Sequence, residues 1–259
     1  CSVVGVNHDE TFHNLAVFLN GNDVVAVAEG GISLFINAER VGQIASNIVN
    51  AYPDRVWAVN IHAGSYAPMY YPNFNTTDGT AIYYGFNVTG FPQAVVNRST
   101  DYGLGRTDWA TYTNQQIEQT AECNIGGQVI IDPETRTATI NVEIYYVSNS
   151  AASTNYLNVI MLEDDIIGPQ ANGHTNPSQY INGQYHHNHV FRDAVTSTWG
   201  DAISPTTAGS LISKTYTYNI PETVGTPNGT SVNIDNVSFL VFVTEQYQGT
   251  PTRPILNAN

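Results

Sequence analysis

The sequence predicts an α+β protein of two domains, in which an N-terminal thioredoxin-like α/β domain precedes a C-terminal immunoglobulin-like antiparallel β-sandwich. In the first half, helical and strand patterns alternate, and a Gly-Phe-Pro turn precedes a buried strand. In the second half, strands are separated by turn-rich loops. The 259 residues suffice for one large or two ordinary domains. We expect a tether or extended arm over residues 1–13, the first domain over 14–124 and the second over 125–259.

The first elements of the N-terminal domain are predicted to be a β-hairpin, a helix and a strand. Apolar runs at residues 15–19 and 24–28 flank Asn20-Gly21-Asn22-Asp23, a typical hairpin turn. Apolar residues recur at helical spacing over residues 41–49, and the apolar run over 55–62 predicts a strand.

The segment from Tyr83 to Arg98, YYGFNVTGFPQAVVNR, predicts the end of a helix, a turn and a buried strand over residues 93–97. Pro92 stands at the start of this strand. Because proline withholds a ladder donor, its presence there favours an X-Pro turn, and we expect a structural cis peptide bond at Pro92. His62 and Arg98 follow predicted strands, where α/β folds place ligands, although both are also compatible with satisfied edge residues.

The C-terminal half begins after a predicted helix within residues 108–122. A hairpin is expected around Asp132-Pro133-Glu134-Thr135, because this turn separates two period-two runs. The further predicted strands are residues 156–163, 213–218 and 237–244.

The charge of the chain restricts its partners. The formal net charge is −14, and Lys214 is the only lysine. Phosphate binding needs a basic surface, so a nucleic-acid partner is excluded. No apolar run is long enough to cross a bilayer, and the abundance of uncharged polar residues favours a secreted or surface-displayed protein.

Two cysteines are present, Cys1 and Cys123. An N-terminal cysteine is typical of a processed bacterial lipoprotein, in which this residue carries the acyl chains. The alternative is a disulfide between Cys1 and Cys123, either within one chain or between neighbouring copies.

An aromatic loop is expected to be a binding surface. Residues 63–80 are rich in Tyr, Pro, Asn and Gly, and such long loops are usually functional. Tyrosine offers contact area at little entropic cost, so the loop is a candidate platform for a carbohydrate or a peptide. The alternative is that the loop packs over a sheet edge. The candidate residues are Tyr66, Tyr70, Tyr71 and Phe74, joined by Tyr83 and Tyr84.

A histidine block, Tyr185-His186-His187-Asn188-His189, is the sharpest candidate for a metal site. On an extended chain, His187 and His189 point the same way, as metal ligands at alternate positions do. Further ligands are conceivable from Glu163, Asp164, Asp165 or His174. The alternative is a set of hydrogen-bonded structural histidines, with the three acids facing solvent or Arg192. No nucleotide or serine-hydrolase motif occurs, and we expect no cofactor.

Four segments together resemble the outer-membrane-protein-twenty-eight-related family of Bacteroidetes surface lipoproteins. The segments are RVWAVNIHAG, FNVTGFPQAVVNR, NVIMLEDDIIGPQ and YHHNHVFRDAVTSTWGD, and the resemblance spans about Gly30 to Phe242. It implies a thioredoxin-like half, a β-rich half and lipid attachment at the outer membrane. When the chain is aligned with the family pattern, Phe35 and Ala38 fall nearest the positions of a Cys-x-x-Cys motif. Neither residue forms a thiolate, so we expect a redox-dead domain.

We therefore expect a non-enzymatic protein of the bacterial outer membrane, surface-exposed or extracellular, that acts in recognition or assembly. Its expected partners are other cell-envelope proteins or like subunits, with a glycan or peptide as a further ligand. Contact with the membrane is expected through a lipid anchor only. Two alternatives stay open: a subunit of an extracellular fibre, held by Cys1 and Cys123 or by strand edges, and a metal-binding protein that uses His187 and His189.

Overall fold

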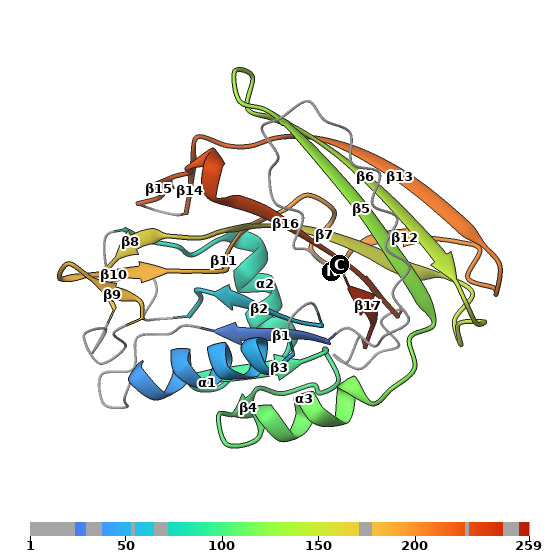
Figure 1. The fold of residues 1–259 in the computed structure, drawn as a ribbon, viewed down its shortest axis with the longest axis horizontal. Helices are drawn as coiled ribbons and strands as arrows, with labels where there is room; N and C mark the ends of the chain where they lie inside the picture. Colours follow the sequence, from blue (N-terminus) through green and yellow to red (C-terminus); the bar gives the residue numbers. More distant parts are fainter. Residues whose placement is uncertain are drawn as a thin grey trace.

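The computed structural model describes residues 24–29, 38–52, 55–64, 72–170, 178–225, 228–245 and 254–258. Three α-helices lie in these ranges: α1 (Ala38–Ala51), α2 (Thr77–Gly85) and α3 (Trp109–Ile117). None of these helices is long and apolar enough to cross a membrane. Most described residues outside the helices belong to strands or to the turns between them (Figure 1).

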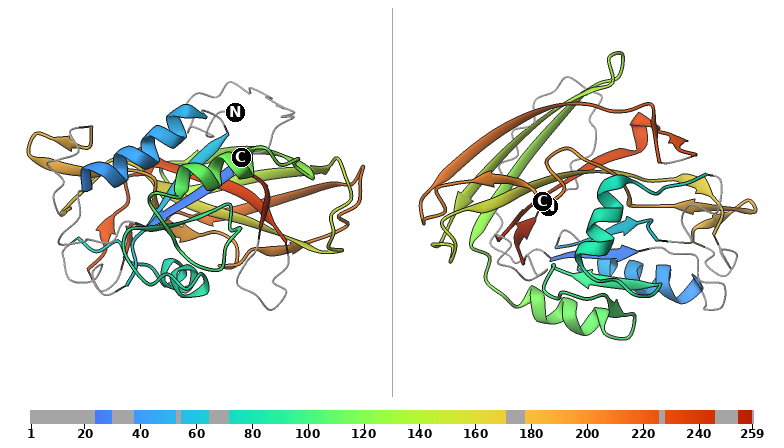
Figure 2. Two further views of the ribbon diagram at one scale, coloured as in Figure 1. Left: turned by 90° about the horizontal axis from the view of Figure 1, so that it is seen from below. Right: turned by 180° about the vertical axis from the view of Figure 1, so that it is seen from behind.

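The largest sheet begins in the N-terminal half. β1 (Val24–Glu29) pairs in parallel with β2 (Val56–Ile61) and antiparallel with β3 (Gln93–Val96). β4 (Leu104–Gly105) then pairs antiparallel with β3. Helix α1 connects β1 to β2, α2 connects β2 to β3, and α3 follows β4. Figure 2 shows that α2 lies on one side of this part of the sheet and that α1 and α3 lie on the other.

The same sheet continues into the C-terminal half through β2. Its strand order is β17-β16-β7-β11-β2-β1-β3-β4, and β12 pairs with β7. The added strands are β7 (Asn155–Glu163), β11 (Val190–Ala194), β12 (Asp201–Ile203), β16 (Val237–Thr244) and β17 (Ile255–Ala258). The predicted domains are therefore hydrogen-bonded to each other within one sheet. The boundary that we placed after residue 124 falls inside a strand, β5 (Cys123–Asp132).

A second sheet covers the C-terminal part of the first. It has the order β13-β6-β5, where β6 is Thr137–Tyr146 and β13 is Leu211–Asn219. One face of this sheet packs on β7 and β16, and the fully buried residues between the layers include Ile140, Ile144, Leu157, Val159 and Val243. This two-layer antiparallel packing agrees with the predicted β-sandwich content.

Two small sheets complete the described strands. One is β8 (Ile166–Gly168), β10 (Gln184–His187) and β9 (Tyr180–Ile181), and the other is β14 (Thr223–Val224) with β15 (Thr230–Ser231). A short 3₁₀ helix, Ile234–Asn236, precedes β16. None of these strands, nor β12 or β17, was expected from the sequence, because short strands carry too little periodicity to identify.

Local chemistry explains several element boundaries. Thr76 caps α2, because its hydroxyl accepts a hydrogen bond from the Gly79 amide at 2.9 Å. Asp132 forms the predicted turn between β5 and β6 by accepting hydrogen bonds from the Glu134 and Thr135 amides. The predicted cis bond is confirmed at Phe91-Pro92. The predicted arm and the first strand of the expected hairpin lie outside the described residues.

Candidate functional site

Cys123 lies at the start of β5 and is completely buried. It is a free cysteine, and burial raises the pKa of its thiol to about 12. The sulfur cannot reach a neighbouring chain unless β5 separates from the core. Cys123 therefore forms no disulfide in this structure, whereas the alternative of a Cys1–Cys123 bond would require one, and Cys1 itself lies outside the described residues.

The aromatic loop is described only in part. Tyr66, Tyr70 and Tyr71 lie outside the described residues. Phe74 is described, but it is buried, and its ring contacts His62 and His187 at centroid distances of 4.9 and 5.0 Å. The structure therefore assigns Phe74 to a core cluster, as in the packing alternative, and removes it from an exposed platform.

A second group of aromatic residues lies next to Pro92 and reaches the surface. Phe91 stacks on Tyr83 with ring centroids 5.7 Å apart and an interplanar angle of 5°. Tyr84 meets Tyr83 edge-on at 4.9 Å and is 70% exposed. Gly64 lies against this group, because a Cβ atom there would approach Cζ of Phe91 to 2.6 Å. We call Tyr83, Tyr84 and Phe91 the aromatic surface. Phe91 had not been selected from the sequence, where it was treated only as a neighbour of Pro92.

His187 is a core residue. It lies on β10, is buried, and contacts the rings of His62 at 5.3 Å and Tyr185 at 4.8 Å. Burial is the main cause that lowers the pKa of His187 to about 4, and burial likewise holds the pKa of His62 well below its ordinary value. Both imidazoles are therefore neutral at neutral pH, as structural histidines in an apolar environment are.

His189 has a different environment, which corrects the expectation that it points the same way as His187. That expectation required an extended chain, but His189 has φ 55° and follows the end of β10. Its Nδ1 lies 3.1 Å from Oδ1 of Asp164 and its amide donates to the same oxygen at 2.5 Å. Burial opposes ionisation of Asp164, but the hydrogen bonds and charge of His189 lower the pKa of this carboxyl overall.

The acids after β7 pair with the histidine block residue by residue. Asp165 accepts a contact from Nδ1 of His186 at 2.5 Å, and the Asp165 amide donates to Oδ1 of Asn188 at 2.9 Å. Asn60 of β2 binds the same block, because its amide donates to the carbonyl of His189 at 2.7 Å. The block therefore fastens the β10–β11 connection to both β7 and β2.

Glu163 and Arg192 form a buried ion pair beneath this block. Nε of Arg192 lies 2.9 Å from Oε2 of Glu163, and the two side chains are 0% and 2% exposed, respectively. Burial raises the pKa of Glu163, and the charge of Arg192 opposes this rise. The Asn233 amide donates to Oε1 of Glu163 at 2.7 Å, and Nη2 of Arg192 donates to Oγ1 of Thr230 at 2.8 Å. Contact with Arg192 was one of the two alternatives to metal binding predicted for the acids at residues 163–165, and Glu163 makes that contact.

These pairings leave no metal centre among the residues that the structure describes, since no group of three or more His, Cys, Asp or Glu side chains is placed to hold an ion. Among the acids considered as ligands, Asp164 and Asp165 bind histidines, and Glu163 binds Arg192. His174 lies outside the described residues.

Arg98 is buried beneath aromatic rings at the end of β3. Its guanidinium carbon lies 4.8 Å from the ring centroid of Phe242 and 5.6 Å from that of Trp199. Nη1 of Arg98 donates to Oδ1 of Asn158 at 3.5 Å. Since Phe242 and Asn158 belong to the C-terminal half, Arg98 joins the two halves as a core residue.

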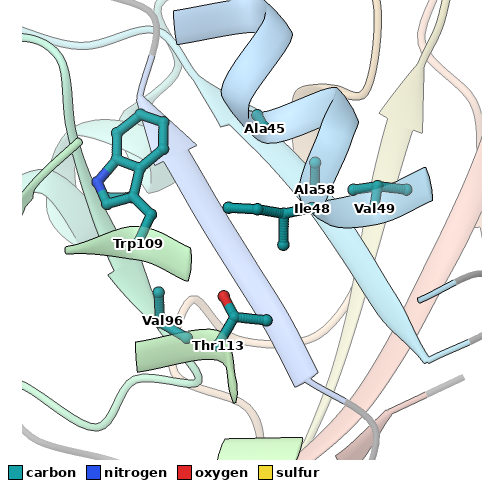
Figure 3. A pocket seen from close by; sticks show the side chains of 8 residues that line it. Ala45, Ile48, Val49, Ala58, Val96, Trp109 and Thr113 are labelled. Atoms are coloured by element: carbon teal, nitrogen blue, oxygen red, sulfur yellow. The ribbon is translucent and has the colours of Figure 1, made fainter. Parts of the chain in front are cut away.

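A small cavity lies between helices α1 and α3 and the sheet (Figure 3). Its volume is about 10 Å³, which accommodates at most one water molecule and is far below the several hundred Å³ of a typical ligand pocket. Its lining is apolar apart from the hydroxyl of Thr113: Ala45, Ile48, Val49, Ala58, Ala94, Val96, Trp109 and Thr113. We therefore assign this cavity to imperfect core packing.

Comparisons with known proteins show which fold and which family this chain shares. The structure of HBP35 of Porphyromonas gingivalis superposes with a TM-score of 0.70 and 15% identity, covering 93% of this chain and 75% of that one, which shows a common fold. A domain of the outer membrane lipoprotein Omp28 from Porphyromonas gingivalis matches 54% of this chain and 87% of its own at 18% identity, but its TM-score of 0.33 supports no structural argument. No curated protein sequence matches this chain. The family model described as "Outer membrane protein Omp28" matches residues 79–251. Because this match covers more than half of the chain, the protein belongs to the Omp28 family of bacterial outer membrane proteins.

Proposed function

We propose that this outer membrane protein is a non-catalytic recognition protein, built from a redox-dead thioredoxin-like half and an immunoglobulin-like β-sandwich. The order β2-β1-β3-β4 supports the first assignment, with β1 and β2 parallel, β3 and β4 antiparallel, and a cis-proline before β3. The three-stranded sheet packed on β7 and β16 supports the second.

The observation that carries the non-catalytic assignment is the state of the cysteines. A thioredoxin-type reaction requires a thiolate at the N-terminus of a helix that follows β1. The segment between β1 and α1 contains no cysteine, and neither does α1. Cys123 lies on β5 in the other sheet, where burial raises its thiol pKa to about 12. It is therefore protonated at neutral pH and supplies no nucleophile.

A disulfide-reduction assay tests this assignment. The full chain, incubated with insulin and a thiol reductant, is expected to reduce insulin no faster than the reductant alone. Cys123→Ser should give the same background rate. Reduction above background that disappears in Cys123→Ser would show that this buried thiol is active and would overturn the assignment.

The proposed recognition surface is the aromatic surface of Tyr83, Tyr84 and Phe91. Aromatic rings at a surface provide broad contact area for a sugar ring or an extended peptide, and the tyrosine hydroxyls add hydrogen bonds. Tyr84 is the exposed member and the natural position for a test.

Arrays of oligosaccharides and of extended peptides are suitable probes for this surface. For any probe that binds the full chain, Tyr84→Ala is expected to weaken binding about tenfold, since an aromatic contact contributes about 1–2 kcal/mol. Tyr145→Ala, which removes an exposed tyrosine from the other sheet, serves as the matched control. Equal affinities for the Tyr84→Ala variant and the unmodified chain would exclude this surface.

Lipid attachment at Cys1 completes the proposal. The family resemblance implies a lipid anchor, and Cys1 is the candidate acylation site. Mass spectrometry of protein isolated from its own membrane is expected to find acyl chains on the peptide that begins with Cys1. An unmodified Cys1 thiol in that peptide would remove the anchor from the proposal while leaving the recognition surface untouched.

A further inference from the structure

The second sheet, β13-β6-β5, has two edge strands, and within the described residues only β5 has a backbone group hydrogen-bonded to a strand outside this sheet. β5 is covered at its start: Nδ2 of Asn257 in β17 donates to the carbonyl of Cys123 at 2.7 Å. β13 is the outermost strand on the other side, as Figures 1 and 2 both show. Among the hydrogen bonds of the described residues, none joins the free side of β13 to another backbone group. Within the part of the chain that the structure describes, β13 is therefore an open edge.

This edge has the features of a strand that pairs readily. β13 is nine residues long, and all nine pair with β6 in an unbroken register from Leu211↔Tyr145 to Asn219↔Thr137. Its sequence, LISKTYTYN, contains no glycine and no proline. Long regular edge strands rich in β-branched and aromatic residues template the addition of another strand, and soluble proteins need a device that prevents it.

Lys214 stands in the middle of this edge. It is the only lysine of the chain, in a protein of net charge −14. It shares a face with Ile212, which is buried in the interlayer core, and with Tyr216, because side chains alternate along a strand. Tyr216 donates from its hydroxyl to Oδ2 of Asp201 in β12, so this face points towards the first sheet. Lys214 itself is exposed and forms no ion pair with a described residue.

The sequence of β13 is close to self-complementary about Thr215. In an antiparallel pair of two such strands related by a two-fold axis at Thr215, Ser213 would face Thr217. Ile212 would face Tyr218 in the same arrangement. Hydroxyl side chains would thus meet at residues 213 and 217 and apolar rings and chains at residues 212 and 218, while Lys214 of each copy would face Tyr216 of the other. Lys214 is the one charged side chain in the strand, and the pairing would bring two lysines onto the inner face of one joined sheet.

We propose that the free edge of β13 is a latent self-pairing surface whose partner is a second copy of this chain, and that the charge of Lys214 keeps it unpaired. Inward-pointing charge is one of the devices by which edge strands resist pairing. Joining two copies would make a six-stranded sheet in which the two Lys214 side chains lie diagonally across from each other on one face, where like charges repel. The surface is distinct from the aromatic surface, and it bears directly on the fibre alternative: strand-edge assembly would require this charge to be removed or neutralised.

Light scattering after size-exclusion chromatography, over a wide range of protein concentration, tests the proposal. Lys214→Thr is expected to form dimers with a dissociation constant about tenfold or more below that of the unmodified chain. Lys214→Arg and Lys214→Glu keep a charge at the edge and are expected to remain monomeric. Arg106→Thr makes the same change in net charge on the β4–α3 connection and should also remain monomeric.

Hydrogen exchange identifies the surface that pairs. In Lys214→Thr dimers, amides on the free side of residues 211–219 should be protected, and they should exchange freely in Lys214→Arg. Three results would each overturn the proposal: dimers of the unmodified chain as strong as those of Lys214→Thr, a Lys214→Thr chain that stays monomeric, or dimers without protection in β13. The insulin-reduction assay and the Tyr84→Ala binding assay test the proposed function independently of these results.

Discussion

The pair Glu163 and Arg192 is a buried contact between two neighbouring strands of the large sheet. Glu163 ends β7 and Arg192 lies on β11, and these strands are neighbours in the large sheet. Both charges are fully buried, so each depends on the other for its compensation. Removing one partner therefore costs more than the pair itself contributes.

We predict that Arg192→Met destabilises the protein by about 3–5 kcal/mol, because it leaves the Glu163 carboxylate buried without a counter-charge. Chemical denaturation gives the free energy of unfolding. The double variant Arg192→Met/Glu163→Gln should recover part of the loss, since no unpaired charge is left. A loss below about 1 kcal/mol for Arg192→Met would show that the pair is not structurally important.

His62 and His187 predict a pH dependence of stability. In the unfolded chain both have a pKa near 6.5. In the folded chain the pKa of His187 is about 4 and that of His62 is well below 6.5. As pH falls from about 6.5 towards 4, the unfolded state binds protons that the folded state excludes. The contribution of these two histidines to the free energy of unfolding is therefore fully present above about pH 6.5. It is lost progressively as the pH falls through this window.

Each of these histidines contributes a slope of at most about 1.4 kcal/mol per pH unit. Chemical denaturation at several values between pH 7.5 and 4.5 measures the slope. His187→Phe removes one titrating group from the ring cluster, so its slope should be smaller than that of the unmodified chain by at most about 1.4 kcal/mol per pH unit. A slope unchanged by this variant would show that His187 does not stay neutral in the folded state.

At the scale of the element, helix α2 depends on close approach to its neighbours. Glycine is a poor helix former, by about 1 kcal/mol relative to alanine, yet α2 contains Gly79 and Gly85. A Cβ atom at Gly85 would lie 2.4 Å from Cη2 of Trp199, and one at Gly79 would lie 3.1 Å from Cγ2 of Ile61. The two glycines therefore lower the helix propensity of α2, but they let it approach closely to β2 at Gly79 and to the loop before β12 at Gly85.

We predict that Gly85→Ala destabilises the protein by about 1–3 kcal/mol despite the better propensity of alanine, because Trp199 must move. Thermal unfolding and tryptophan fluorescence measure both effects. Gly90→Ala is the matched control, since no atom lies within 4 Å of the Cβ position there, and it should change stability by less than about 0.5 kcal/mol. A stabilised Gly85→Ala chain would contradict the packing argument.

At the scale of the whole molecule, the two predicted domains share a core. Val59, Ile61 and Val95 of the N-terminal half pack in one cluster with Phe191 and Phe242 of the C-terminal half. β11 also covers the edge of β2 through the pairing of Val190 with Asn60. Separation at residue 124 would expose both the apolar cluster and the strand edge.

We predict that a fragment of residues 1–124 does not unfold cooperatively, because part of its core belongs to the other half. Thermal unfolding followed by circular dichroism measures this. Mixing the fragment with residues 125–259 should restore a cooperative transition. A fragment that melts cooperatively at the temperature of the full chain would instead show that the first predicted domain is independent.

The sequence by itself determined the local features of this protein. The longer strands, the helices α1 and α3, the cis-proline at Pro92 and the turn at Asp132 were all predicted, because each depends on neighbours within a few residues. The family resemblance was also carried by the sequence, and the family match confirmed it. The boundary after residue 124 falls inside β5, because the switch in periodicity there marks the start of the second sheet.

The tertiary structure alone decided what the chemically active residues do. Asp164 and Asp165 are 25 and 21 residues from the histidines that they bind, and the sequence left a metal site open beside the hydrogen-bonded block. In the described residues, the left-handed backbone at His189 places it apart from His187. The structure also placed Phe74 in the core and Lys214 on the edge strand β13. Burial and pairing arise from contacts between distant segments, and periodicity along the chain does not contain that information.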